Sequence, residues 1–185
     1  KPLYKLFIAL KEQGLNRNLQ EWFNVKKVKE SDLSEWEDFI KKIEKKKKSI
    51  KIGLVEKYVG TSEPYISVFE AIKAAAYHND RDVEIITIEA EKLEENNSDT
   101  WDLLKSVDGI VMPGGFGKRG VEGKILAAKW ARENKVPYLG LCLGLHVMLI
   151  DAARSLLNLK DASSTEFDKK TKNPVISLLE EQKKV

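Results

Sequence analysis

The chain has 185 residues, of which 42% are apolar, so it is long enough for the core of one α/β domain and a short additional segment. Its 32 Lys and Arg residues nearly balance its 29 Asp and Glu residues, which argues against a dedicated nucleic-acid-binding protein. A single cysteine excludes an internal disulfide, and one cysteine with two histidines is a poor ligand set for zinc. Without a signal peptide or a long apolar stretch, we expect a cytoplasmic protein that binds neither nucleic acid nor membrane.

Residues 1–48 carry apolar side chains at three- and four-residue intervals, which predicts helices. Asp32 is followed three residues later by Glu35, so we expect a capping box at the start of the second helix. The lysine run at 45–48 then indicates an exposed helix end or a linker. Because the first residue is Lys1 and not Met, we expect the chain to be part of a longer or processed protein.

After residue 48, short apolar runs alternate with longer amphipathic segments, as in repeated βαβ units. The predicted strands are Ile50–Val55, Val83–Ile88, Val107–Met112 and Pro137–Leu141. The predicted helices between and after them lie at about 65–78, 99–106, 121–134 and 144–157. This order predicts an α/β fold with a doubly wound, flavodoxin-like and mostly parallel sheet, preceded by a short helical segment. Since such sheets carry their sites at the carboxyl ends of the strands, the segments that follow the four strands are the candidates.

The loop after the third predicted strand contains Gly115, Gly117 and Gly120 in G-x-G-x-x-G spacing. A dinucleotide site needs this turn after the first strand and an acidic residue at the end of the next, so we disfavour a nicotinamide or flavin site. The glycines still allow positive φ angles and leave backbone N–H groups free to face a ligand or an oxyanion. A flexible loop without a ligand is the alternative.

The fourth predicted strand ends in Gly140-Leu141-Cys142-Leu143-Gly144, the pattern of a nucleophile elbow with cysteine as the nucleophile. Such a nucleophile occupies a strained turn, and bulky flanking residues would collide with it. The helix that begins after Cys142 directs its positive end at the sulfur and favours the thiolate. The N–H of Leu143 would face the oxyanion of an attacked carbonyl. A buried structural cysteine is the alternative.

Neither histidine is an obvious base for this thiol. His78 lies at the end of the helix predicted at 65–78, and we expect it at the surface. His146 lies four residues after Cys142 on one helix, where side chains lean toward the amino end, so it points toward the surroundings of the nucleophile. We favour a substrate-side or packing role for His146 over a role as the base.

Three further stretches accompany the cysteine elbow: residues 113–117 (Pro-Gly-Gly-Phe-Gly), 119–125 (Arg-Gly-Val-Glu-Gly-Lys-Ile) and 164–167 (Ser-Thr-Glu-Phe). Together they resemble the glutaminase domain of the CTP synthase family, within the class I glutamine amidotransferases. Residues 1–48 resemble the end of the amidoligase domain and its linker. Residues 49–185 resemble the N-terminal part of the glutamine amidotransferase domain, which implies a sheet that is incomplete toward the C-terminus.

This resemblance implies an enzyme that makes CTP from UTP, ATP and L-glutamine, with ammonia passing to the amidoligase domain of the same polypeptide. It implies ATP and Mg²⁺ at that domain, GTP as an allosteric activator, a homotetramer, and no cofactor in the present chain. Cys142 would form the glutamyl thioester, and the N–H groups of Gly115 and Leu143 would hold its oxyanion. The other glutamine-binding residues that it implies are Phe116, Gly144, His146 and Glu166. Of these, Glu166 would pair with the substrate ammonium.

Four residues depart from the family pattern, and we expect altered glutamine affinity and weaker GTP contacts from them. Leu145-His146 replaces Met-Gln, Glu56 replaces a glycine before Lys57, and Ile66 replaces a lysine. The catalytic His-x-Glu pair of the family would lie beyond Val185. Two alternatives therefore stay open: a non-catalytic glutamine-binding or regulatory module, and another elbow-cysteine α/β family acting on aldehydes or peptides. A sheet without its later strands would also expose apolar surface and associate.

Overall fold

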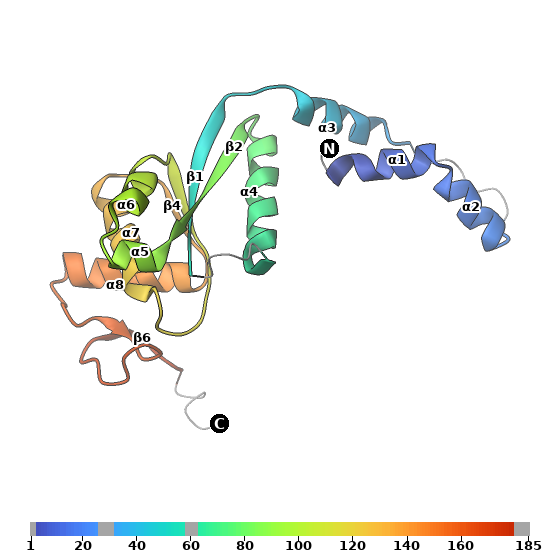
Figure 1. The fold of residues 1–185 in the computed structure, drawn as a ribbon. Helices are drawn as coiled ribbons and strands as arrows, with labels where there is room; N and C mark the ends of the chain where they lie inside the picture. The colour runs from blue at the N-terminus through green and yellow to red at the C-terminus, as the bar shows by residue number, and fades with distance from the viewer. Residues whose placement is uncertain (1–2, 26–31, 58–62, 180–185) are drawn as a thin grey trace. The chain divides into compact units, whose positions relative to one another are not determined.

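The computed structural model describes residues 3–25, 32–57 and 63–179, and the chain divides into two compact units, residues 1–47 and 48–185. The first unit is helical, as predicted. Its elements are η1 (Leu3–Lys5), α1 (Leu6–Glu12), α2 (Leu15–Trp22) and α3 (Ser34–Glu44). Each unit is described by itself below (Figure 1).

Aromatic side chains hold the first unit together. The ring of Trp36 packs edge-on against Phe7, with centroids 5.5 Å apart, and Tyr4 packs edge-on against Phe39 at 5.4 Å. The indole N–H of Trp36 donates to the carbonyl oxygen of Tyr4 at 2.8 Å. These contacts join the first helical turn of the unit to α3, so they close the unit on itself.

The predicted capping box at the start of α3 is wrong. The residue at the N-cap position is Leu33, whose side chain makes no capping hydrogen bond. The carboxylate of Asp32 instead accepts the backbone N–H of Ser34 at 2.9 Å, a local turn two residues long. This short-range hydrogen bond competes with the capping geometry, in which the acceptor would stand three residues before its donor.

The second unit is built on a four-stranded parallel sheet in the order β2-β1-β3-β4, which confirms the predicted fold class. The strands are β1 (Ser49–Glu56), β2 (Asp82–Glu89), β3 (Gly109–Met112) and β4 (Tyr138–Gly140). The third strand begins two residues later than predicted. The carboxylate of Asp108 accepts the N–H of Lys51 at 2.8 Å, so a side chain occupies the place of a ladder bond there.

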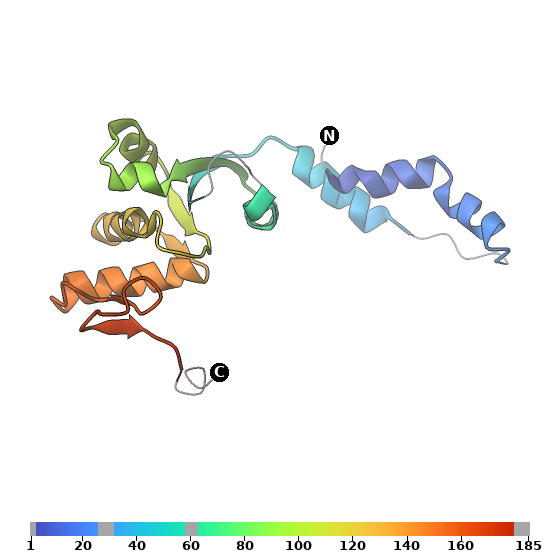
Figure 2. The ribbon, with the colours of Figure 1, turned by 60° about the horizontal axis from the view of Figure 1, so that its bottom comes forward.

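Helices cover the sheet on both faces, as a doubly wound fold requires. The helices are η2 (Glu63–Tyr65), α4 (Ile66–His78), α5 (Ala90–Glu94), α6 (Ser98–Lys105), α7 (Val121–Glu133) and α8 (Leu143–Leu156). Figures 1 and 2 show α4 on one face and α5 to α8 on the other. The short helix α5 was not predicted. In the described part of the chain, no helix has the length and apolar character to cross a membrane.

The larger core lies between the sheet and helices α5 to α8. It includes Val55, Ile88, Met112 and Ile150, which are fully buried. A smaller cluster of Leu54, Tyr65 and Val111 lies on the α4 side. The face with α5 to α8 is therefore the better packed of the two.

A second, two-stranded parallel ladder follows α8 and was not predicted. It pairs β5 (Ser163–Ser164) with β6 (Pro174–Ile176) through an irregular register. The buried hydroxyl of Ser164 accepts the backbone N–H of Glu166 at 3.2 Å, which fixes the turn that leaves β5. This ladder therefore positions Glu166 relative to the sheet.

Candidate active site

Cys142 has a strained backbone. Its backbone has φ 54° and ψ −112°, a region that side chains rarely adopt. It follows β4 directly and is the N-cap residue of α8, and its side chain is exposed. The backbone N–H groups of Leu145 and His146 both donate to its carbonyl oxygen, at 2.9 and 3.2 Å. The predicted strand, turn and helix of a nucleophile elbow are thus present, and the alternative of a buried cysteine is wrong.

Close backbone packing explains the two glycines that flank this cysteine. A Cβ on Gly140 would come within 2.6 Å of the carbonyl oxygen of Gly144. A Cβ on Gly144 would overlap the carbonyl oxygen of Met112, the last residue of β3. The sequence argument placed these collisions against the nucleophile itself. In the structure they occur within the turn and against β3.

The glycine loop, residues 113–120, lies beside the elbow. A Cβ on Gly114 would stand 3.4 Å from Cβ and 3.8 Å from Sγ of Cys142, so this part of the loop is packed against the cysteine. Positive φ angles occur at Gly117 (75°) and Gly120 (65°) and not at Gly114 or Gly115. Gly114 therefore serves close approach to Cys142, whereas Gly117 and Gly120 serve the turn into α7.

Side chains from four different elements or loops hold the backbone of the glycine loop. The Lys124 ammonium donates to Pro113 O at 2.8 Å, and the Tyr65 hydroxyl donates to Gly114 O at 3.2 Å. The Lys57 ammonium donates to the carbonyl oxygens of the residues at 116 and 117, at 3.2 and 2.5 Å. A carboxylate oxygen of Glu166 accepts the N–H of residue 117 at 3.2 Å. The loop is therefore tied to several distant parts of the second unit.

Two backbone N–H groups near Cys142 have no acceptor among residues 63–179. They belong to Leu143, the first residue of α8, and to Gly115 in the glycine loop. First-turn N–H groups of a helix have no partner within the helix and attract negative charge. This reasoning applies to Leu143, and the oxyanion role of both donors stays a prediction.

A buried lysine lies behind the glycine loop. Lys124 is fully buried on α7, and its pKa is lowered to about 7, first by burial and then by the charge of Lys57. The charges of Glu56 and Cys142 oppose this shift. Burial also lowers the pKa of Lys57, against the attraction of Glu166.

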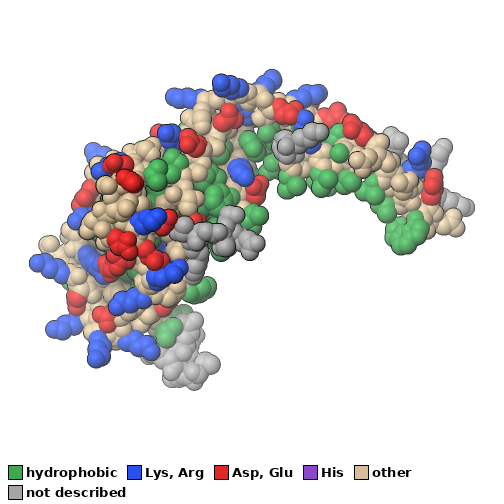
Figure 3. Space-filling model, viewed as in Figure 1, with side chains coloured by type: hydrophobic (Ala, Val, Ile, Leu, Met, Phe, Trp, Pro, Cys, Tyr) green, Lys and Arg blue, Asp and Glu red, His purple; other side chains and the backbone are tan. Residues whose placement is uncertain are grey.

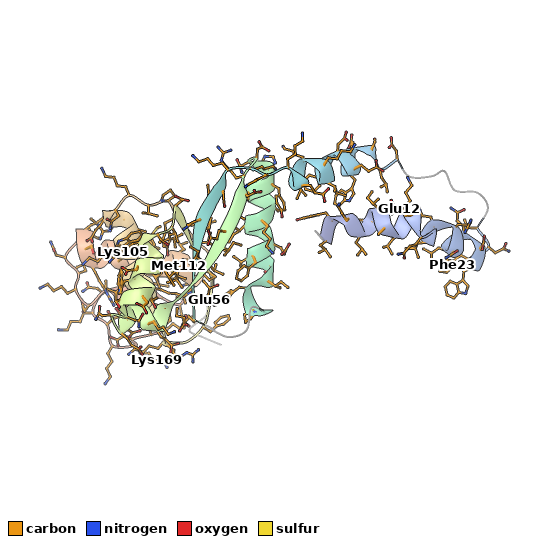
Figure 4. All side chains as sticks on the ribbon, turned by 45° about the horizontal axis from the view of Figure 1, so that its top comes forward. Glu12, Phe23, Glu56, Lys105, Met112 and Lys169 are labelled. Atoms are coloured by element: carbon orange, nitrogen blue, oxygen red, sulfur yellow. The ribbon has the colours of Figure 1, made fainter. Side chains whose placement is uncertain are left out.

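Glu56 ends β1 and is 4% exposed. Burial raises the pKa of its carboxyl, the charge of Lys124 opposes this, and that of Glu89 adds to it. Within the described residues, its Oε2 atom has no hydrogen-bond partner. Figure 4 labels Glu56 and Met112, which end β1 and β3 at the carboxyl edge of the sheet. Glu56 is therefore a buried acid next to the candidate site.

The remaining predicted residues lie around the same edge. Phe116 projects from the glycine loop with 82% of its surface exposed, and Glu166 is exposed beside it. Gly144 is buried, and its carbonyl oxygen accepts the Tyr138 hydroxyl at 2.7 Å. His146 is half-buried on α8, and only its backbone is seen to contact Cys142. His78 is exposed at the end of α4, as expected.

Sequence reasoning missed Lys57, Tyr65 and Lys124. The signal for Lys124 was a lysine at helical spacing between apolar residues, three after Val121 and four before Ala128. A charged residue on the buried face of a helix is rare unless it has a polar partner. Among the described residues, no group of three or more His, Cys, Asp and Glu side chains is placed to hold a metal ion.

The family model described as glutamine amidotransferase class-I matches residues 62–184. The chain therefore belongs to the class-I glutamine amidotransferase family. Within that family it is similar to CTP synthases: it is 46% identical over 183 residues to CTP synthase of Bacillus subtilis and 47% identical over 183 residues to that of Clostridium beijerinckii. Each match covers 99% of this chain and 34% of the relative, so the chain spans about a third of the length of these relatives.

A solved structure gives the same result for the fold. The glutaminase domain of Trypanosoma brucei CTPS with bound acivicin is 35% identical and superposes with a TM-score of 0.66. The match covers 71% of this chain and 50% of that one. The resemblance to the CTP synthase family is thus confirmed.

Proposed function

We propose that Cys142 is the nucleophile of a glutaminase site that releases ammonia from L-glutamine for the amination of UTP to CTP. The observation that carries this proposal is the exposed cysteine at φ 54° at the N-cap of α8, with two N–H donors nearby that have no acceptor among residues 63–179. Membership of the amidotransferase family and similarity to CTP synthases support it.

The proposed reaction passes through a glutamyl thioester on Cys142. The thiolate of Cys142 attacks the side-chain carbonyl carbon of glutamine, and the electron pair moves to the oxygen, where the N–H groups of Gly115 and Leu143 would receive it. The electron pair on the oxygen then re-forms the carbonyl bond, and the carbon–nitrogen bond breaks. This leaves a glutamyl thioester on Cys142, and the nitrogen departs as ammonia with the proton from the thiol. Water attacks the thioester carbon next, which gives glutamate and restores the thiol. The resemblance assigns the proton transfer to a histidine paired with a glutamate, outside the described residues.

Four residues would hold the substrate. Glu166 would pair with the α-ammonium of glutamine, since its carboxylate is exposed next to the glycine loop. Phe116 would line the pocket, Gly144 would leave room for the substrate at the helix start, and His146 would contact the substrate side. Because His146 stands in place of a glutamine of the family, we expect altered affinity and not loss of binding.

The partner that we propose for this site is the amidoligase domain of the same polypeptide, in a cytoplasmic homotetramer with GTP as activator. ATP and Mg²⁺ would act at that domain. The greater length of the CTP synthase relatives supports a further domain in the same polypeptide. So do the exposed apolar residues of the first unit, which gather along one side of α1 and α2 (Figure 3). They are Leu6, Phe7, Leu15, Leu19 and Trp22. As the end of an amidoligase domain with its linker, residues 1–48 would bury this side.

The test is glutamine hydrolysis and CTP formation by the complete polypeptide, with Cys142→Ala as the variant. We expect Cys142→Ala to abolish formation of glutamate from glutamine while CTP formation from added ammonia continues, which also shows that the variant is folded. A glutamyl adduct on the peptide that contains Cys142 should appear after acid quenching. Glutamine binding without glutamate formation by the unaltered protein would reject the proposal and favour a binding module.

A further inference from the structure

The Gly114–Gly115 peptide next to the nucleophile needs an external restraint. Two adjacent glycines lack the Cβ atoms that limit backbone rotation, so this peptide can turn over more easily than others. Gly114 nevertheless packs against Cys142, with the added Cβ 3.8 Å from its sulfur. A donor to an oxyanion is effective only if it is oriented before the reaction. Something outside the loop must therefore keep the N–H of Gly115 in one direction.

The geometry of a trans peptide links the two ends of this group. Its C=O and N–H bonds point in opposite directions, so a hydrogen bond to the oxygen also sets the direction of the N–H. The Phe116–Gly117 peptide is held at both ends in this way. Lys57 donates to its carbonyl oxygen, and its N–H donates to the carboxylate of Glu166. The described residues contain no cis peptide bond.

Tyr65 occupies the corresponding position for the Gly114–Gly115 peptide. Its hydroxyl donates to the carbonyl oxygen of Gly114 at 3.2 Å, which leaves the N–H of Gly115 on the opposite side. Its ring is 5% exposed and is packed with Leu54 and Val111 in the core on the α4 side. A hydroxyl on a ring held by the core is a fixed donor, because the ring has few alternative rotamers when packed.

We propose that Tyr65 is a positioning residue that orients the N–H of Gly115 toward the oxyanion formed on Cys142. This inference rests on the proposed glutaminase function. It adds a residue 77 positions before the nucleophile in the chain (142 − 65 = 77). Tyr65 touches neither the substrate nor the sulfur in this account, since it acts through the peptide that it holds.

The test uses Tyr65→Phe in the complete polypeptide, since this change removes the hydroxyl and keeps the packed ring. The matched control is Tyr77→Phe on α4, outside the site. We expect kcat for glutamine hydrolysis to fall by about 10- to 100-fold, because loss of an oxyanion donor lowers kcat by about 100- to 1,000-fold and a misdirected donor is lost only in part. KM for glutamine and CTP formation from added ammonia should stay within about twofold of the unaltered protein, because the substrate contacts and the other domain are untouched.

A second measurement separates orientation of the oxyanion donor from general stability. The aldehyde analogue of glutamine forms a tetrahedral adduct with a thiol and places an oxygen where the oxyanion forms, whereas glutamate does not. Tyr65→Phe should weaken binding of the aldehyde by the same factor as kcat and leave glutamate binding unchanged. Equal kcat in Tyr65→Phe and in the unaltered protein, or equal weakening of both ligands, would overturn the inference and leave the glutaminase proposal standing. No glutamine hydrolysis by the unaltered protein would overturn both.

Discussion

Replacement of Lys124 by Met should change how the stability of the fold depends on pH. Lys124 is fully buried, and its pKa falls from 10.5 to about 7 in the folded chain, chiefly because of burial. In the unfolded chain the same lysine keeps its proton up to about pH 10. Between about pH 7 and 10 the unfolded state therefore binds more protons than the folded state. The free energy of unfolding must then rise with pH across this window.

The size of the effect follows from the two pKa values. At about 1.4 kcal/mol for each pH unit, the step from 10.5 to about 7 makes the charged lysine about 5 kcal/mol less favourable in the folded chain. Methionine has a similar length and no charge, so Lys124→Met removes this penalty. It also leaves the carbonyl oxygen of Pro113 without its donor, which costs about 1–3 kcal/mol. Glu56 loses a favourable neighbour as well, which reduces the gain further.

The difference in stability between the variant and the unaltered chain should therefore change sign with pH. Below about pH 7, Lys124→Met should be more stable by at most about 2–4 kcal/mol, and near pH 10 it should be less stable by about 1–3 kcal/mol. Urea unfolding of residues 1–185 from pH 6 to 10, at protein concentrations that do not affect the midpoint, measures this. Lys129→Met, an exposed lysine on the same helix, is the matched control and should run parallel to the unaltered chain. Parallel curves for Lys124→Met would refute the reasoning.

Two further predictions concern the elbow and the α4 side of the sheet. Gly144→Ala should destabilise the fold by about 2–4 kcal/mol, because the added Cβ would overlap the carbonyl oxygen of Met112. Gly117→Ala is the control: its Cβ would meet open space, and the φ of 75° alone should cost about 1–2 kcal/mol. Equal losses of stability in urea unfolding would contradict this prediction. Leu139→Lys should reduce self-association of residues 1–185. Leu139 is 56% exposed and lines an apolar groove of about 470 Å³, together with residues of α4 and β3, and a charge there would oppose apolar contact between chains. Sedimentation velocity that finds the unaltered chain monomeric at all concentrations would reject the association hypothesis.

Local sequence was sufficient for the main sheet, for most of its helices and for the elbow, but not for α5 or the β5-β6 ladder. Apolar runs and amphipathic segments predicted all four strands of the main sheet and four of its helices, because periodicity reflects which side of each element is buried. Gly140, Cys142 and Gly144 predicted the strained turn, because only small residues fit where a strand and a helix meet so closely. The capping box at Asp32 failed, since a two-residue turn and a helix cap use the same side chain and the pattern does not decide between them.

Contacts between distant parts of the chain were decided only by the tertiary structure. Tyr65 and Glu166 are far apart in sequence and reach the same glycine loop, one from the start of α4 and the other from the turn after β5. Nothing in their neighbouring residues indicates those partners. Lys124 lies in a helix whose pattern places it inside, but its partner, the carbonyl oxygen of Pro113, is supplied by β3 and its loop. Sequence by itself therefore determined the strands of the main sheet, four of its helices and the elbow turn at Cys142, whereas three-dimensional packing decided which side chains hold the loop beside it, since a hydrogen bond depends on distance and direction and not on spacing along the chain.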